Sequence, residues 1–91
     1  MAKKYLFRLY HSGEFSINGA ISNLKNILTE KFNDQYSLEI INVIEAPEFV
    51  VRGNVFMTPT LVKHLPPPSV AVVGSLSDIE KLSAAVDISV T

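Results

Sequence analysis

The feature that most constrains this sequence is an apolar segment placed between prolines. Residues 56–68 read FMTPTLVKHLPPP, with Pro59 just before the β-branched run and three consecutive prolines, from Pro66 to Pro68, just after it. Proline fixes φ and removes a backbone donor, so it is confined to the ends and edges of strands. The pattern favours a strand over residues 58–65 that is delimited by proline at both ends, although a helix would also tolerate Lys63 and His64.

The first half of the chain predicts a βαβ unit. Residues 4–10 are rich in aromatic and aliphatic side chains, as strands are. The run at residues 37–44 predicts a second strand, and its almost continuous apolar character predicts cover on both faces, as for an inner parallel strand. Apart from Arg8, no basic residue lies between the aromatic ones of the first strand, so a core or interface is favoured over an RNA-stacking surface. The first strand would place Tyr5, Phe7 and Leu9 on one face and Leu6, Arg8 and Tyr10 on the other.

Between these strands the apolar residues follow a helical period. The break at Gly13 precedes the helix, and Asn33 with Asp34 ends it. Residues spaced by three and four positions form one stripe, which predicts a helix packed against the sheet. The stripe consists of Ile17, Ala20, Ile21, Leu24, Ile27, Leu28 and Phe32.

Local signals in the second half do not agree on one structure. Residues 45–56 are compatible with a short helix after Pro47 or with a strand over residues 49–51. Residues 69–74 predict a strand. Residues 75–88 predict a helix with Ser77 and Glu80 as a capping box, yet residues 86–90 alternate like a strand. Well-specified sequences agree across these levels, so the conflict is itself informative.

Composition and charge exclude several classes of protein. The 91 residues form a single domain, residues 1–91, with 47% hydrophobic residues and a net charge of −1. This charge gives no general attraction for nucleic acid or an anionic membrane. The absence of cysteine excludes disulfides, thiolate zinc sites and CxxC redox chemistry. No signal peptide and no apolar run of ~18 residues is present. We expect a soluble, cytoplasmic protein without nucleic-acid or membrane partners.

The sequence contains no recognisable catalytic, metal or cofactor site. The histidines are not paired at a spacing that places two ligands on one face. Ser12 lies outside any nucleophile elbow, and neither GxGxxG nor a P-loop is present. We therefore expect no catalytic residue, no metal and no cofactor. The residues considered as metal ligands are His11, His64, Glu14, Glu45 and Glu48.

Thr58-Pro59 indicates a particular scaffold. In thioredoxin-like folds a βαβ unit is followed by a strand that begins with a cis X-Pro bond, close to the loop after the first strand. Pro59 has this place, and the corresponding loop, residues 11–16, contains no cysteine. The alternative is a trans proline that begins an edge strand. The first interpretation predicts a thioredoxin-like scaffold that is used for binding.

Segments distributed from Tyr5 to Leu82 resemble the KaiB family. They read LFRLYHSG, LKNIL, IINVIEAPEF, TPTLVKHLPPP and VVGSLSDIEKL. The resemblance implies an α/β fold with a thioredoxin-like βαβ N-terminal half. It also implies that the C-terminal half adopts either the KaiB resting arrangement, βαββααβ, or the thioredoxin-like one, βαβαββα.

The same resemblance implies a non-enzymatic regulator in a circadian-type oscillator. Its expected partner is a KaiC-type hexameric ATPase, and its storage form is a homo-oligomer, a tetramer or a dimer. The residues expected to take part in fold switching are Pro59, Pro66 and Pro68, and those expected in partner or oligomer contacts are Tyr5, Arg8, Lys25, Arg52 and Lys63.

Two alternatives remain open at this point. One is a thioredoxin-like adaptor that binds a signalling kinase or another partner, as the related domain of the clock kinase SasA does. The other is a thioredoxin-like or glutathione-type enzyme that uses a serine, which the absence of cysteine disfavours. The chain also lacks charge where the family carries it, which weakens an electrostatically steered contact and suggests a divergent paralogue. The positions that lack the family's charge are Gly19, Ser22, Asn54, Val70, Ala71 and Ser75.

Overall fold

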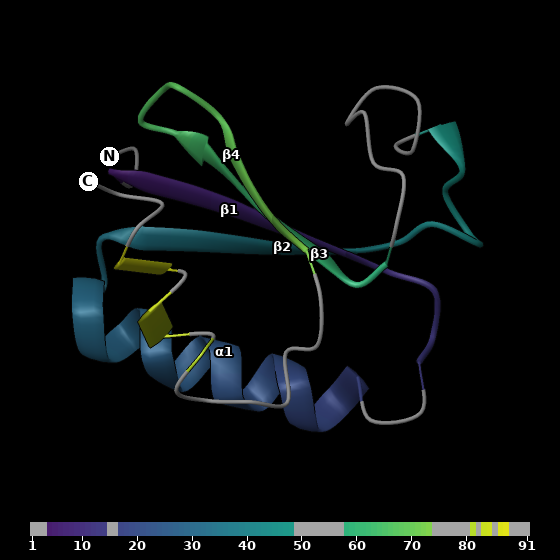
Figure 1. Ribbon diagram of the computed structural model, residues 1–91, viewed down its shortest axis with the longest axis horizontal. Coiled ribbons are helices and arrows are strands. Elements are labelled where there is room, and N and C mark those ends of the chain that lie inside the picture. Colours follow the sequence, from purple (N-terminus) through teal and green to yellow (C-terminus); the bar gives the residue numbers. More distant parts are fainter. Residues whose placement is uncertain are drawn as a thin grey trace.

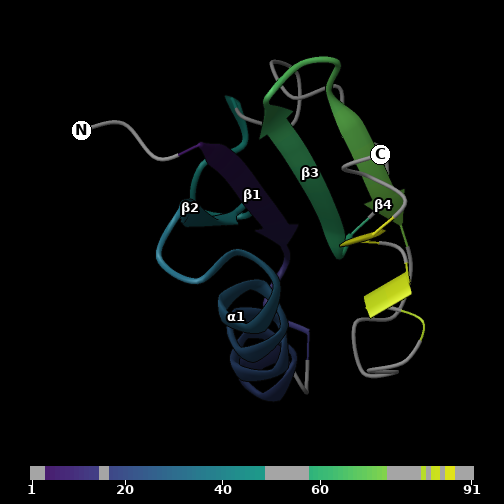
Figure 2. The ribbon, with the colours of Figure 1, turned by 90° about the vertical axis from the view of Figure 1, so that its left-hand side faces the viewer.

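The computed structural model describes residues 4–14, 17–48, 58–73, 81, 83, 84, 86 and 87. Its strands form one four-stranded sheet in the order β2-β1-β3-β4. The β1 and β2 strands are parallel, whereas β3 is antiparallel to both β1 and β4. Helix α1 covers one face of the sheet (Figures 1 and 2). The elements are β1 (Tyr5–His11), α1 (Ile17–Phe32), β2 (Tyr36–Asn42), β3 (Thr60–Leu65) and β4 (Val70–Val73).

The predicted alternation of β1 and the stripe of α1 are both confirmed. Phe7 and Leu9 are fully buried against α1, and Tyr10 is fully buried on the other face of the sheet. The aromatic residues of β1 are therefore largely core, as expected. Helix α1 ends at Phe32, and Asn33 adopts a left-handed conformation with φ 56°. The buried residues of the helix are Ile17, Ala20, Leu24, Ile27 and Leu28.

The expectation for the second strand was wrong in one respect. Among the described strands β2 lies at the edge of the sheet, and none of its residues is buried. Its apolar residues serve both faces, because Leu38 packs against the core under α1 while Ile41 packs beside Tyr10. An apolar run can therefore come from an edge strand that contributes to two clusters. Ile40 is 37% exposed.

The proline-bracketed segment is a strand in the interior of the sheet. The Thr58-Pro59 bond is cis, as are Leu65-Pro66 and Pro67-Pro68. Because β3 lies between β1 and β4, the alternative of a trans proline that begins an edge strand is wrong. Leu61 and Val62 are buried on opposite faces, so β3 joins the two apolar clusters.

Part of the C-terminal half also packs on the α1 side. The described residues 81, 83, 84, 86 and 87 are helical, as the sequence predicts for this segment. Val86 is fully buried in the same cluster as Leu24 and Leu28, and the Lys31 ammonium contacts the Asp87 carboxylate at 2.5 Å. These contacts attach the C-terminal segment to α1.

Several predictions fall outside the described residues. They include the alternatives for residues 49–56 and the capping box at Ser77 and Glu80. The strand-like alternation over residues 86–90 is wrong for residues 86 and 87, which are helical, and residues 88–90 lie outside the described part. Arg52 also lies outside the described residues. In the part of the chain that the structure describes, no helix has the length and apolar character needed to cross a membrane.

Candidate functional site

The loop after β1 meets the turn that leads into β3, as the thioredoxin-like interpretation predicts. The Ser12 and Thr58 hydroxyl oxygens are 3.0 Å apart, and Pro59 follows directly. The Ser12 hydroxyl also donates to Glu14 Oε1 at 2.8 Å, and the Ser12 N–H lies 3.0 and 3.1 Å from the two carboxylate oxygens. Gly13 bridges these residues with φ 80°, a left-handed conformation that favours glycine. The loop and the proline turn are thus joined by side chains.

The Glu14 carboxylate is the electrostatic centre of this junction. Burial alone would raise the pKa of Glu14, but several hydrogen bonds outweigh it and lower the pKa to about 2. The donors are backbone N–H groups of Glu14 and Ser12 and the hydroxyls of Ser12 and Thr58. Hydrogen bonds to a carboxylate stabilise its charged form, so Glu14 stays ionised at neutral pH.

This arrangement is poorly suited to nucleophilic catalysis. The only carboxylate that contacts Ser12 within the described residues has a pKa of about 2, so it is a weak base. The neighbouring His11 ring does not serve Ser12, because its Nδ1 accepts a hydrogen bond from the Gly13 N–H at 3.0 Å. The junction therefore acts as a structural link between the two halves of the chain.

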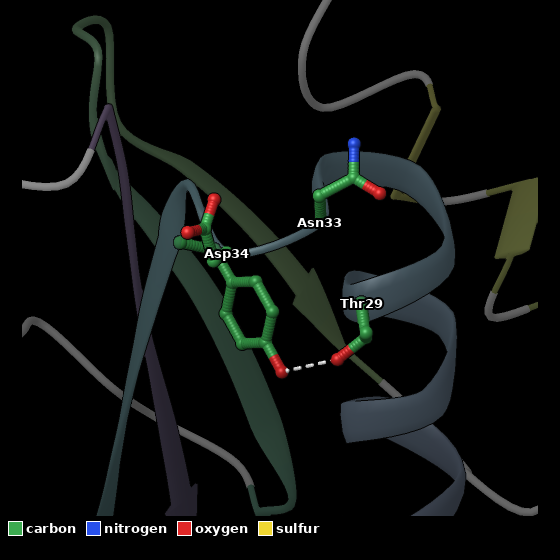
Figure 3. Close-up of a pocket in the computed structure, with 4 residues that line it drawn as sticks. Thr29, Asn33 and Asp34 are labelled. Carbon is green, nitrogen blue, oxygen red and sulfur yellow. Dashed lines mark hydrogen bonds between the residues drawn. The ribbon is translucent and has the colours of Figure 1, made fainter.

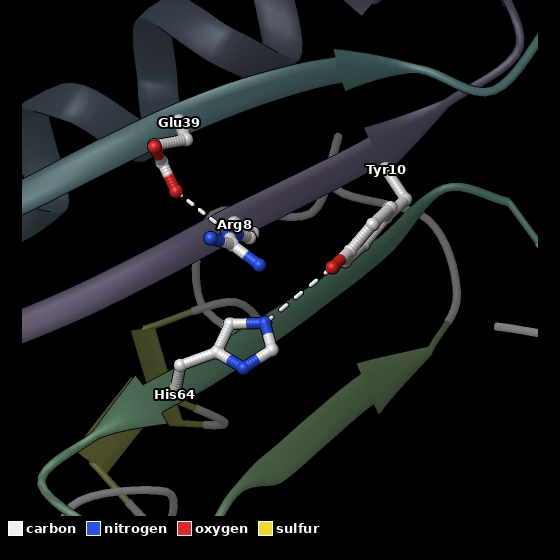
Figure 4. Close-up of polar contacts among 4 residues, drawn as sticks. All are labelled: Arg8, Tyr10, Glu39 and His64. Carbon is white, nitrogen blue, oxygen red and sulfur yellow. Dashed lines mark hydrogen bonds and ion pairs between the residues drawn. The ribbon is translucent and has the colours of Figure 1, made fainter. Parts of the chain in front are cut away.

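A second polar cluster lies on the face of the sheet opposite α1 (Figure 4). Arg8 Nε on β1 donates to Glu39 Oε1 on β2 at 2.5 Å, and the Tyr10 hydroxyl is 3.4 Å from His64 Nε2 on β3. The hydrogen bond with Glu39 raises the pKa of Arg8 and outweighs the lowering by burial. Burial lowers the pKa of His64, and the Arg8 charge lowers it further, whereas Glu39 acts in the opposite direction. The cluster joins three adjacent strands.

An open hollow lies where α1 ends and β2 begins (Figure 3). It is lined by Thr29, Asn33, Asp34 and Tyr36. The Thr29 and Tyr36 hydroxyls bond to each other at 2.8 Å, and the Tyr36 hydroxyl also donates to the Lys25 carbonyl at 3.3 Å. These hydrogen bonds connect the first residue of β2 to the helix. The residues that line the hollow therefore serve to connect the helix to the strand.

The residues expected in contacts lie in very different environments. Tyr5 is half-buried, and its ring stacks on Phe32 with centroids 4.2 Å apart. Arg8 is half-buried and paired with Glu39, while Lys25 is exposed on α1. Lys63 is only 4% exposed, and its side chain forms no hydrogen bond or ion pair with another described residue. Their role in partner or oligomer contacts therefore remains a prediction, and in this arrangement only Lys25 of the four is openly presented.

The remaining features of the site are the three prolines and the contacts that were not predicted from the sequence. Pro59 lies in the junction with the β1 loop, and Pro66 and Pro68 form the turn between β3 and β4. No sequence motif indicated the links Glu14–Ser12–Thr58, Tyr10–His64 or Lys31–Asp87. The available signal was topological, because a thioredoxin-like arrangement already places the β1 loop beside the residue before the cis proline.

The fold and the junction define a thioredoxin-like protein without redox cysteines. A solved structure of the N-terminal domain of Synechococcus elongatus SasA matches with a TM-score of 0.78 at 24% identity, over 99% of this chain and 86% of that one. The thioredoxin Deadhead from Drosophila melanogaster matches with a TM-score of 0.72 at 19% identity, over 94% and 81% of the two chains. At these identities the likeness establishes the fold alone.

The sequence comparisons define the family. A model of the KaiB domain matches residues 8–88. The circadian clock oscillator protein KaiB of Microcystis aeruginosa is 39% identical over 87 residues, which cover 94% of this chain and 84% of that protein. The circadian clock protein KaiB3 of Synechocystis is also 39% identical, over 93% and 84% of the two chains. The chain belongs to the KaiB family, as its resemblance implied.

Proposed function

We propose that this chain is a non-enzymatic regulatory protein of the cytoplasm that binds a KaiC-type hexameric ATPase in a circadian-type oscillator. The observation that carries the proposal is a KaiB domain on a thioredoxin-like sheet. The loop after β1, where thioredoxins carry their redox cysteines, contains Ser12, Gly13 and Glu14 instead. Without cysteine the scaffold keeps the shape of a thioredoxin and lacks its thiol chemistry. Such a scaffold is suited to binding.

The storage state in this proposal is a homo-oligomer, a tetramer or a dimer. Release from it accompanies rearrangement of the C-terminal half between the resting and the thioredoxin-like arrangement. Pro59, Pro66 and Pro68 delimit β3 and its turn, which is the segment whose environment would change. Support comes from the conflicting local propensities of the second half, since sequences with two arrangements of similar free energy satisfy neither fully.

The contact surface is tested through α1. Lys25 is exposed there, so its replacement changes charge without removing core contacts. The experiment immobilises the KaiC-type hexamer of the same organism with ATP and measures binding of the wild type and of Lys25→Glu by biolayer interferometry. Glu30→Lys is the matched control, because Glu30 is exposed on the same helix and lies five residues further along.

We expect Lys25→Glu to weaken binding about tenfold or more, as charge reversal at a complementary contact does, and Glu30→Lys to change it less. Equal effects of the two variants would remove Lys25 from the contact surface. No binding by the wild type, also after a day of incubation, would overturn the partner assignment.

A second candidate function is an adaptor for another signalling protein, such as a kinase. It is favoured by the neutral residues Gly19, Ser22 and Ala71, which are exposed where the family carries basic ones. Fewer positive charges reduce electrostatic steering toward an acidic partner. Competition between the KaiC-type hexamer and the candidate kinase for the labelled protein distinguishes the two functions. At equal concentration, the partner with the higher affinity displaces the other.

A further inference from the structure

His64 occupies an irregular position in the interior strand β3. The register between β1 and β3 shifts between Leu6 and Phe7, which leaves His64 opposite no residue of β1. A bulge of this kind redirects a side chain. The imidazole is half-buried on the face opposite α1, with its Nε2 3.4 Å from the Tyr10 hydroxyl (Figure 4).

The hydroxyl that His64 contacts belongs to a fully buried residue. Tyr10 is 0% exposed. Its hydroxyl oxygen lies 3.4 Å from His64 Nε2, at hydrogen-bonding distance. The Tyr10 hydroxyl can donate to His64 Nε2 only when that nitrogen carries no proton, as in one tautomer of the neutral imidazole. Arg8 lies on the same face of the sheet and bonds to Glu39 (Figure 4).

We propose that His64 is a proton-sensitive contact between β1 and β3. The neutral imidazole accepts from Tyr10 and stabilises the pairing of the two strands. The imidazolium loses this acceptor and places a second positive charge beside Arg8. This inference concerns the isolated chain and does not rest on the proposed partner.

Among the described residues, few groups near His64 could compensate for its charge. From β1 it faces Arg8 and Tyr10, and from β2 it faces Glu39. The four residues of β4 have no titratable side chain, and α1 lies across the sheet. The Glu39 carboxylate already forms an ion pair with Arg8. A protonated His64 would therefore share this carboxylate with Arg8.

The direction of the effect follows from these contacts. Burial first and the Arg8 charge second lower the pKa of His64 below its usual 6.5. Near pH 6.5 the unfolded chain therefore binds more protons than the folded one, and stability rises with pH. The contribution is complete above pH 6.5 and is lost as the pH falls toward the lower pKa of the folded state.

The test is urea unfolding between pH 8 and pH 5 of the wild type, His64→Gln and His11→Gln. Glutamine still accepts from Tyr10 and does not ionise, whereas His11→Gln removes the other histidine. On acidification the unfolding constant of the wild type and of His11→Gln should rise by about threefold or more relative to His64→Gln. Equal pH dependence in all three proteins would overturn the proposal.

A second measurement holds even where His64→Gln fails to fold. The ring resonances of the two histidines are followed by NMR against pH, with His11→Gln providing the assignment. We expect the His64 ring to titrate below 6.5, and in Tyr10→Phe to titrate closer to it, because the hydrogen bond to the neutral imidazole is gone. Titration of His64 above 6.5 in the folded protein would overturn the proposal.

Discussion

Glu14→Gln is the substitution that most sharply tests the junction between the β1 loop and the turn before β3. The amide keeps the size of the side chain but removes the charge that the surrounding donors stabilise. Two oxygens that accept from Ser12 become one oxygen and one NH₂ group, which faces a donor instead of accepting. We therefore expect a clear loss of stability at neutral pH.

The magnitude follows from the hydrogen bonds to the carboxylate. At about 1.4 kcal/mol for each unit of pKa, a carboxyl group whose pKa falls from 4.5 to about 2 contributes at most about 3.5 kcal/mol. Glu14 is partly exposed, and screening by solvent reduces this value. We expect Glu14→Gln to lower the free energy of unfolding by about 1–2 kcal/mol at pH 7.

The assay is urea unfolding at pH 7 and pH 3, with Glu30→Gln as the matched control on an exposed position of α1. Because the pKa of Glu14 is depressed in the folded state, its contribution is present above pH 4.5 and is lost as the pH falls toward 2. The gap between wild type and Glu14→Gln should therefore narrow at pH 3. Equal stability of the two proteins at pH 7, or a gap that does not change with pH, would refute the reasoning.

Three further predictions concern packing and charge. Leu24→Ala removes a fully buried side chain and should cost about 2–5 kcal/mol in urea unfolding, whereas Ile44→Ala, at a 72% exposed position, should stay within about 0.5 kcal/mol. Lys63→Met replaces an almost fully buried cation by an apolar side chain of similar length. It should raise the free energy of unfolding by about 1 kcal/mol and therefore raise the melting temperature. A lower melting temperature would show that the ammonium is stabilising. A double-mutant cycle of Arg8→Gln and Glu39→Gln should give a coupling below about 1 kcal/mol, because both side chains are partly exposed, and a larger value would contradict this.

Residues with strong periodicity were predictable from the sequence. The stripe from Ile17 to Phe32 gave α1, and the alternation around Phe7 gave the two faces of β1. Both patterns depend on which face of the element each side chain occupies, and residue spacing alone determines this, so local sequence is sufficient. The cis bond at Pro59 followed from placing that strand after a βαβ unit, which is topological information.

The position of β2 and the polar contacts were not predictable in the same way. The apolar run around Ile41 does not reveal whether the strand lies at the edge or in the interior of the sheet, because an edge strand can contribute side chains to two apolar clusters. The contacts of Glu14 with Thr58 and of Tyr10 with His64 join residues far apart in the chain. No spacing rule connects such pairs until the sheet order is known.

The most direct test of the central claim is size-exclusion chromatography of the purified protein, alone and mixed with the KaiC-type hexamer of the same organism and ATP, sampled over a day. The account predicts that the protein elutes alone as a small oligomer and then moves slowly into a complex of the size of the hexamer or larger. An unchanged elution position at every time point would contradict the proposed regulation of a KaiC-type ATPase.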